Sequence, residues 1–240
     1  DLLDLMKENL LSPAMLVSLK DVPGLDVISV EDDGSVRIGA MLTLAALADH
    51  SLVRQRYPAL VEALRGLASP QIRNIATLGG NLLQRPRCWY FRAADYHCLR
   101  KGGLHCYAIP GENQYHAIFD NFPCAIVHPS TTATPLVALG ATVELVAVGG
   151  AQRHLRLEDF FVLPQRDAQR ENDLKPQEIV TAIRLPPVPA NVRMAHLKQG
   201  EKDSFDWPLA DVTVVLDLDQ DQSCRRASIV LGAAAPVPHR

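Results

Sequence analysis

The segment PPVPANV, at residues 186–192, places the strongest constraint on how this chain can fold. Proline fixes φ and has no backbone N–H, so three prolines in close succession extend neither a helix nor a central strand. We therefore expect a linker here, with a domain boundary near Val188. Residues 1–187 would form a first domain, and residues 188–240 the start of a second.

The hydrophobic pattern before residue 69 predicts a mixture of helices and strands. Residues 1–10 carry leucine and methionine at helical spacing. Residues 43–68 predict two helices, interrupted near Tyr57-Pro58. Asp33-Gly34 supplies a tight turn between two extended segments, which indicates a hairpin. The predicted extended segments cover residues 15–19, 25–30 and 35–40.

The rest of the chain is mostly β-rich, apart from one long irregular stretch. Residues 69–124 show no hydrophobic period and contain glycines, cysteines and aromatic residues. A helix is predicted around Pro135–Leu139. Strands are predicted at residues 124–129, 141–148, 149–157, 178–186, 210–218 and 226–235. The pattern indicates an α+β fold without internal repeats.

Composition and charge exclude several classes of function. The 240 residues are 48% hydrophobic, enough to bury a core without disulfides or metal. The net charge of −3, without a basic block, argues against nucleic-acid and anionic-membrane partners. No apolar run approaches the roughly 18–20 residues of a membrane span. Both ends of the sequence look cut, so an upstream targeting segment would not be visible.

Four of the five cysteines fall in the irregular stretch: Cys88, Cys98, Cys106 and Cys124. They are separated by nine, seven and seventeen residues, whereas structural zinc sites usually contain pairs two to four residues apart. Iron–sulfur clusters accept four thiolates at irregular spacing. An iron–sulfur cluster, a zinc site and disulfide-paired or free thiols all remain open at this point. Cys224 stands alone and is expected to be a small buried residue.

The segment SPQIRNIATLGGNLLQ, at residues 69–84, is a candidate ligand-binding turn. Gly79-Gly80 allows close backbone approach, and Thr77 and Asn81 add short polar side chains. Such a turn can form a nest of N–H groups for a phosphate. It matches neither the dinucleotide fingerprint nor a P-loop, so no motif supports nicotinamide binding on a Rossmann unit.

The combination IRNIATLGGNLLQRPRC resembles the flavin-binding (medium) subunit of the molybdenum hydroxylases. That family includes xanthine dehydrogenase, carbon monoxide dehydrogenase and aldehyde oxidoreductases. Further similar segments follow in the family's order, and together they cover nearly the whole chain. They are DLLDLMK, which resembles the tail of the first pyrophosphate loop, VRIGAMLTLAALA, CAIVHPSTTATPLVALGATVEL, LKQGEKDSFDWPLADVTV and LGAAAPVPHR.

The resemblance implies an FAD-binding domain of the vanillyl-alcohol-oxidase-like type, followed by a truncated α/β C-terminal domain. The cysteine-bearing insertion, at about residues 85–125, resembles that of periplasmic-type aldehyde oxidoreductases, where this loop carries an extra 4Fe-4S cluster. On that resemblance the ligands are Cys88, Cys98, Cys106 and Cys124. Trp89, Tyr90 and Phe91 would then shield the cluster from water or pack the loop.

The resemblance also assigns FAD contacts residue by residue. They are Asp1, Leu2, Thr77, Gly79, Gly80, Asn81, His128, Pro129, Ser130 and Lys198. Where the family often has aspartate after the serine, this chain has Thr131. Lys198 would lie near the isoalloxazine ring and stabilise the reduced flavin, and a solvated strand lysine is the alternative interpretation. Trp207 would flank the flavin or lie in the core.

No paired carboxylates, nucleophile elbow or histidine pair stands out, so no catalytic residue is predicted. This suits an electron-transfer subunit whose partners are a molybdopterin-binding large subunit, a 2Fe-2S small subunit and an external electron acceptor. A cytoplasmic location is expected, with the periplasm as the alternative if a partner's signal exports the folded complex. A stand-alone flavin oxidase and a zinc-stapled interaction domain are the alternative functions.

Overall fold

The larger of two β-sheets is antiparallel throughout, with strand order β1-β2-β5-β3-β4. The computed structural model describes residues 1–240. The predicted hairpin at Asp33-Gly34 is confirmed, because β1 and β2 pair antiparallel on either side of this turn. Within the turn, Asp33 Oδ1 accepts a hydrogen bond from Ser35 N. The five strands are β1 (Ile28–Val30), β2 (Val36–Gly39), β3 (Thr142–Ala147), β4 (Gln152–Arg156) and β5 (Glu178–Leu185).

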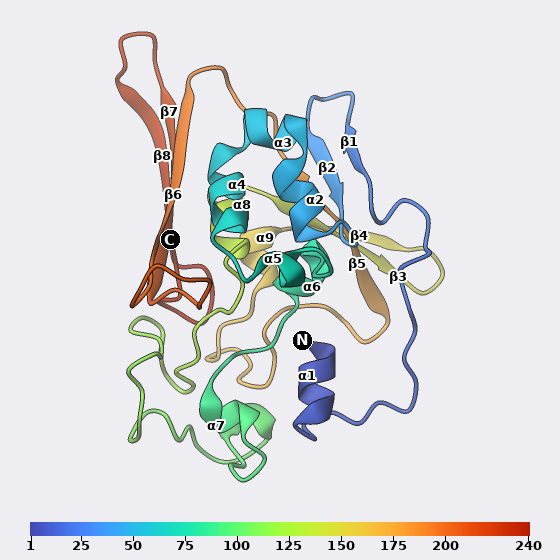
Figure 1. Cartoon of the computed structure of the whole chain (residues 1–240), viewed down its shortest axis with the longest axis vertical. Helices are drawn as coiled ribbons and strands as arrows, with labels where there is room; N and C mark the ends of the chain where they lie inside the picture. The colour runs from blue at the N-terminus through green and yellow to red at the C-terminus, as the bar shows by residue number, and fades with distance from the viewer.

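The second sheet contains three antiparallel strands in sequence order. They are β6 (Val192–Gln199), β7 (Ala210–Leu218) and β8 (Cys224–Gly232). The proline-rich segment carries the chain from β5 to β6, and therefore from one sheet to the other (Figure 1). The Tyr57 hydroxyl donates to the carbonyl oxygen of Pro186 at 3.1 Å, which ties this segment to the helices.

Helices fill the space between the two sheets (Figure 1). Residues 43–68 form three helices rather than the predicted two, because the extended backbone of His50 (φ −66°, ψ 124°) ends one helix before another begins. The Thr43 hydroxyl caps the first by accepting from Ala46 N at 3.2 Å. The helices are α2 (Leu44–Asp49), α3 (Ser51–Arg56), α4 (Pro58–Arg65) and α8 (Ala133–Ala138).

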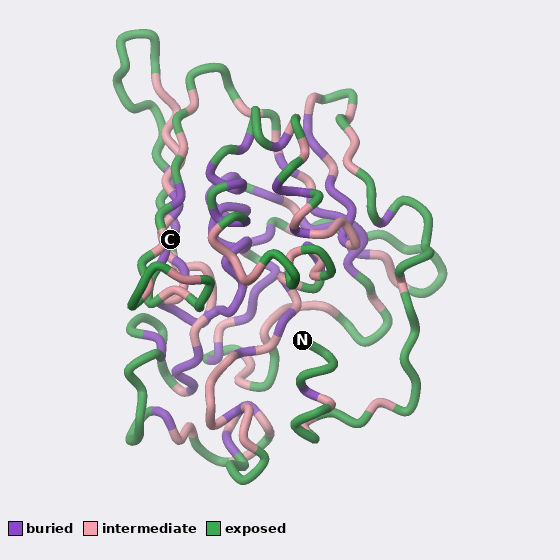
Figure 2. The backbone as a smooth tube through the Cα atoms, viewed as in Figure 1, coloured by how far each residue is buried: buried purple, intermediate pink, exposed green.

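One hydrophobic core joins both sheets and these helices. It includes Ile38 and Ile183 of the larger sheet, Leu60 of α4, and Val230 of β8, all fully buried. Figure 2 shows this buried interior, whereas the tip of the β7–β8 hairpin is exposed. The two sheets share this core. The assignment of residues 188–240 to a separate domain stays a prediction.

The irregular stretch contains only single turns of helix. They are α5 (Pro70–Arg73), α6 (Leu78–Leu82), α7 (Trp89–Arg92) and a 3₁₀ turn, η1 (Leu99–Lys101). The predicted helix at the start of the chain is confirmed as α1 (Leu2–Lys7), and α9 (Leu157–Phe160) follows β4. No helix has both the length and the apolarity that crossing a lipid bilayer requires.

Two predicted strands are wrong. Residues 15–19 are coil without a ladder partner, and all but Leu19 are exposed. Residues 124–129 are buried, but their backbone pairs with other coil: Ala117 N donates to Ala125 O, and His128 N donates to Ala235 O. The apolar run therefore indicates that this segment is buried, not that it forms a hydrogen-bonded strand.

Candidate functional site

A cavity of about 560 Å³ lies between the α4–α6 segment and the connection from β6 to β7. The predicted contact residues that line it are Asp1, Thr77, Gly80, Asn81, Pro129 and Lys198. Gly79 and Ser130 are buried behind its wall, and His128 lines an adjoining cavity. Leu2 is exposed on α1 and lines neither cavity.

The glycine turn at α6 uses its amides within the protein. Gly79 N donates to Ala40 O at 2.8 Å, and Leu78 N donates to Leu42 O at 3.0 Å. Gly80 N donates to the Thr77 hydroxyl at 3.1 Å, which caps the helix. The predicted nest of free N–H groups is therefore not present at these positions. A Cβ on Gly79 would lie 2.9 Å from Ala40 Cβ, so this glycine is required by packing.

Asn81 is held so that its amide group faces the cavity. Its Oδ1 accepts hydrogen bonds from Ser130 Oγ at 2.7 Å and Thr132 Oγ1 at 2.6 Å. Its NH₂ group has no acceptor in the protein, although an asparagine amide carries two donors. The two hydroxyls thus fix the side chain and leave donors for a ligand.

Lys198 fastens two walls of the cavity together. Its Nζ donates to the carbonyl oxygens of Gly66 (3.0 Å), Ser204 (3.4 Å) and Asp206 (2.5 Å), which use all three of its donors. Burial lowers the pKa of Lys198, and nearby carboxylates led by Asp206 oppose that effect. The lysine is therefore neither simply solvated nor free to donate to a ligand.

Arg73 holds the wall formed by residues 66–69, and sequence reasoning missed it. Its Nη1 donates to Leu67 O at 2.8 Å and Ala68 O at 2.6 Å. Its guanidinium also lies over the ring of Phe205, 5.5 Å from the centroid. The strained backbone of Ala68, with φ of 48°, shows how tightly this loop turns. Arg73 ends a one-turn helix, and nothing in the local sequence distinguishes it from an ordinary surface arginine.

A second cavity of about 360 Å³ adjoins the first. The two share six lining residues: Arg87, Pro129, Thr131, Asp206, Trp207 and Pro208. Trp207 is 60% exposed rather than in the core, and the Arg87 guanidinium lies 5.2 Å from its ring centroid. Arg87 Nε is buried without an acceptor, and its Nη1 pairs with the carboxylates of Asp1 at 3.3 Å and Asp4 at 3.5 Å.

Burial controls the charges along the second cavity. It raises the pKa of Asp211 to about 6, against the opposing effects of Thr134 and Lys198. It lowers the pKa of His128 to about 3, so this imidazole is neutral at physiological pH. The His128 ring packs edge-on against Phe161, with centroids 4.3 Å apart. Asp211 Oδ1 is buried and has no hydrogen-bond partner.

Cys88 lines the second cavity. It lies near Cys98 and Cys106, and Cys106 in turn lies near Cys124, so each loop cysteine has another cysteine as a neighbour. None forms a disulfide. The interaction with the Cys124 thiol lowers the pKa of Cys106, and the same interaction raises the pKa of Cys124. Burial raises the pKa of Cys88, and the charges of Cys106 and Cys98 contribute. The predicted buried position of Cys224 is wrong, since it is exposed where β8 begins.

Buried nitrogen atoms without a partner lie near two of these cysteines. His116 Nε2 lies 3.2 Å from Cys88 Sγ, and His116 Nδ1 is buried without a partner. Arg100 Nε and Nη2 are also buried and unpaired, close to Cys124. Burial opposes the charge of Arg100, but Cys124 and Glu171 raise its pKa. No three His, Cys, Asp or Glu side chains converge on a point that could hold a single metal ion.

Aromatic side chains pack around the same loop. Phe91 is buried with Leu5 and Cys98 in a small separate core. Trp89 contacts Tyr115 and His116 edge-on, with ring centroids 5.9 and 5.1 Å apart. Of the four loop cysteines, Cys98 and Cys124 are buried, whereas Cys88 and Cys106 are partly exposed.

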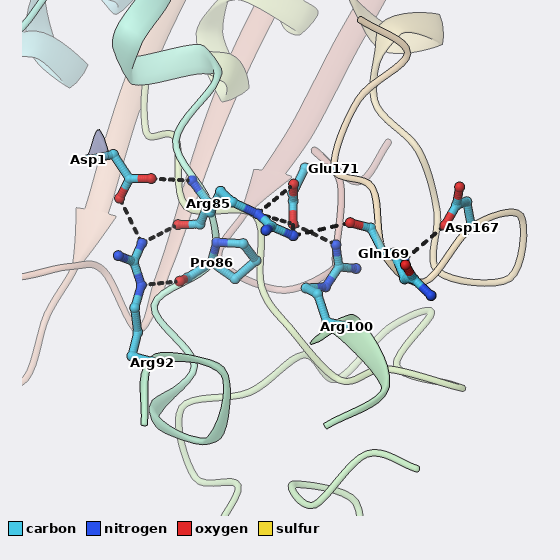
Figure 3. A network of polar contacts seen from close by, with 8 residues as sticks. All are labelled: Asp1, Arg85, Pro86, Arg92, Arg100, Asp167, Gln169 and Glu171. Carbon is cyan, nitrogen blue, oxygen red and sulfur yellow. Dashed lines mark hydrogen bonds and ion pairs between the residues drawn. The ribbon is translucent and has the colours of Figure 1, made fainter. Parts of the chain in front are cut away.

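An ion-pair network joins the start of the chain to the cysteine loop (Figure 3). Asp1 accepts from Arg85 N at 2.9 Å and from Arg92 Nη2 at 2.7 Å. Glu171 accepts from Arg85 Nη2 at 3.0 Å and from Arg100 Nη1 at 2.8 Å. The Asp1 carboxylate is therefore bound by the loop, although Asp1 also lines the larger cavity.

Residues 1–188 match the family model described as the FAD binding domain in molybdopterin dehydrogenase. The chain belongs to this family, and the predicted mixed fold with an FAD-binding domain is confirmed. It is 36% identical over 242 residues to the aldehyde oxidoreductase FAD-binding subunit PaoB of Escherichia coli (strain K12), a match that covers 100% of this chain and 74% of PaoB.

Other relatives are more distant. Identity is 26% over 226 residues with the xanthine dehydrogenase FAD-binding subunit of Escherichia coli O157:H7, covering 94% of this chain and 61% of that subunit. The reconstituted CO dehydrogenase from Oligotropha carboxidovorans has a similar fold, with a TM-score of 0.72 and 27% identity over 99% of this chain and 66% of its own. The chain thus spans less than two thirds of these two proteins.

Proposed function

We propose that this chain is the FAD-carrying, electron-transferring subunit of a molybdenum hydroxylase complex. The observation that carries the proposal is the 560 Å³ cavity, walled by the IRNIATLGGNLLQ segment in a member of an FAD-binding family. Its volume is within the range of cofactor sites, and it continues into a second cavity, as an elongated cofactor requires. Bound FAD would supply the redox chemistry of the subunit.

The residues that remain unpaired along the cavities suit such a cofactor. The Asn81 amide is a donor without an acceptor. Arg87, which pairs with Asp1 and Asp4, would bring a positive charge close to a pyrophosphate. Lys198 and Arg73 would hold the walls in place rather than contact the phosphates. Among the predicted contacts, Thr77, Gly80 and Pro129 would shape the surface against which FAD packs.

We further propose that Cys88, Cys98, Cys106 and Cys124 hold a 4Fe-4S cluster. Four soft thiolates suit such a cluster, and the unpaired donors of Arg100 and His116 suit its acceptor sulfur atoms. The ligands of a cubane cluster need not converge on one point, because four irons lie between them. A single zinc ion does need that convergence, so a zinc-stapled domain is not favoured.

The similarity to PaoB makes an aldehyde the preferred substrate of the complex, with an N-heterocycle as the alternative. A molybdopterin subunit would oxidise the substrate, a 2Fe-2S subunit would pass electrons on, and this chain would deliver them to an external acceptor. We propose a cytoplasmic location, or a periplasmic one through a partner's export signal. A stand-alone flavin oxidase is not favoured, because PaoB and the xanthine dehydrogenase relative are FAD-binding subunits.

One anaerobic experiment tests both cofactors. We would record the ultraviolet–visible spectrum of the purified full-length protein and assay flavin, iron and acid-labile sulfide in the same sample. Flavin bands with about four irons per chain are expected. Flavin without iron or sulfide in anaerobically prepared protein would refute the cluster alone. Protein that binds no flavin, even after incubation with FAD, would refute the whole proposal.

A further inference from the structure

Arg100 is a buried cation without enough partners. Its side chain is 1% exposed, and only Nη1 has an acceptor, Glu171 Oε1 at 2.8 Å. Nε and Nη2 are buried without an oxygen or nitrogen acceptor, and the only other group that the guanidinium contacts is the Cys124 thiol, a weak acceptor. A buried donor on a charged group costs free energy when it has no acceptor, so we expect a group outside the polypeptide to accept from Arg100.

Glu171 cannot balance the charge by itself. It also pairs with Arg85, so two guanidinium groups share one carboxylate (Figure 3). The Cys124 thiol is the other group that interacts with Arg100. A neutral thiol adds no negative charge, whereas a cluster held by four thiolates is an anion.

We infer that Arg100 is the counter-charge and N–H···S donor of the cluster proposed above, and that it sets the cluster's reduction potential. The inference rests on the proposed cluster. A fixed cation and two donors at the sulfur atoms stabilise the reduced, more negative state, which raises the potential. Arg100 would thus be a positioning and tuning residue, not a ligand.

Arg85 provides a matched control within the same ion-pair network. It donates to the same carboxylate, but its side chain is 34% exposed. Its Nε and Nη2 are already paired with Glu171 and with the Gln169 carbonyl. An equal change at residue 85 therefore disturbs Glu171 without removing a donor from the cysteines.

The experiment is a redox titration of the full-length protein, purified with its partner subunits and followed by the electron paramagnetic resonance signal of the 4Fe-4S cluster. Arg100→Met should shift the midpoint potential to a more negative value, and Arg100→Lys should shift it less, since it keeps the charge but loses the planar fork of donors. Arg85→Met and Arg85→Lys should leave the potential unchanged. The flavin potential should not move in any variant.

Two results would overturn the inference. One is full iron content in both Arg100 variants with the wild-type potential. The other is loss of iron from both Arg100 variants while the Arg85 variants keep it, which would assign Arg100 a structural role only. Wild-type protein without iron would instead refute the underlying cluster proposal, so the two failures are distinguishable.

Discussion

Lys198 on β6 donates to the carbonyl oxygen of Gly66, 3.0 Å away, and so links the second sheet to the loop after α4. Lys198→Met should loosen this loop and weaken FAD binding about tenfold or more, because a charged hydrogen bond contributes roughly 1.5–3 kcal/mol. The FAD dissociation constant, measured by fluorescence titration of the flavin-free protein, tests this. Lys202→Met, at a 75% exposed side chain, is the control. Equal affinities for both variants would contradict the proposed clamp.

Adjacent glycines of α6 should respond differently to substitution. Gly79→Ala places a Cβ 2.9 Å from Ala40 Cβ and should destabilise the fold by about 1–3 kcal/mol. Gly80→Val meets only the Thr77 hydroxyl and projects beside the cavity, so it should mainly reduce FAD occupancy. Urea unfolding and flavin content separate the two effects. Full flavin occupancy in Gly80→Val would show that this glycine has only a structural role.

Cys106 and Cys224 form a matched pair for the cluster. Cys106→Ser should abolish the iron–sulfur absorbance and leave most of the flavin bound, because the cluster needs four thiolates. Cys224→Ser should change neither the iron–sulfur absorbance nor the flavin content, since this side chain is exposed on β8 of the three-stranded sheet. Iron content is the measurement. A Cys106→Ser protein with unchanged iron would remove Cys106 from the ligand set.

Asp211 should make stability depend on pH. Burial raises its folded-state pKa from the usual 3.8 to about 6, so the folded protein binds the proton more tightly than the unfolded chain. Stability from this group is therefore present below about pH 4 and is lost as pH rises to about 6. Asp211→Asn should remove this pH-dependent loss, so above pH 6 its free energy of unfolding should exceed that of wild type by about 3 kcal/mol. The melting temperature of the flavin-free variant should exceed that of wild type by about 5–10 °C at pH 7.5 and equal it near pH 4.

Asp219→Asn, the same substitution at an exposed carboxylate, is the control for this experiment. The depressed pKa values of His128 and His196, about 3 and about 4, act in the opposite direction as pH falls below 6.5. They are common to all three proteins, so the difference between the wild-type and Asp211→Asn profiles isolates Asp211. Parallel profiles for these two proteins would refute the prediction.

Local patterns predicted most of the regular structure. The Asp33-Gly34 hairpin, α1 and strands such as β5 and β7 follow from turn chemistry and hydrophobic spacing. The break at His50 was missed because no proline or glycine marks it. Residues 124–129 were assigned wrongly because an apolar run is equally compatible with buried coil.

The site was harder to predict because its contacts are long-range. Thr77 and Asn81 were identified from the motif, but the acceptor role of Asn81 toward Ser130 depends on two segments 49 residues apart. Glu171 lies in a segment that reads as a charged loop, and nothing local pairs it with Arg100, 71 residues earlier. Nor could spacing show that the α6 amides are bonded to residues 40 and 42.

The bonds from the Asp1 carboxylate to Arg85 and Arg92 have a consequence for assembly. Asp1 lines the larger cavity and is hydrogen-bonded to both ends of the segment 85–92, which contains Cys88. Ordering of this segment therefore also orders that part of the cavity wall. Occupancy of either site should then favour occupancy of the other, and by thermodynamic reciprocity the two effects are equal in free energy. Maturation in the cell would thus be cooperative, and chains that lack one prosthetic group would lose the other more readily.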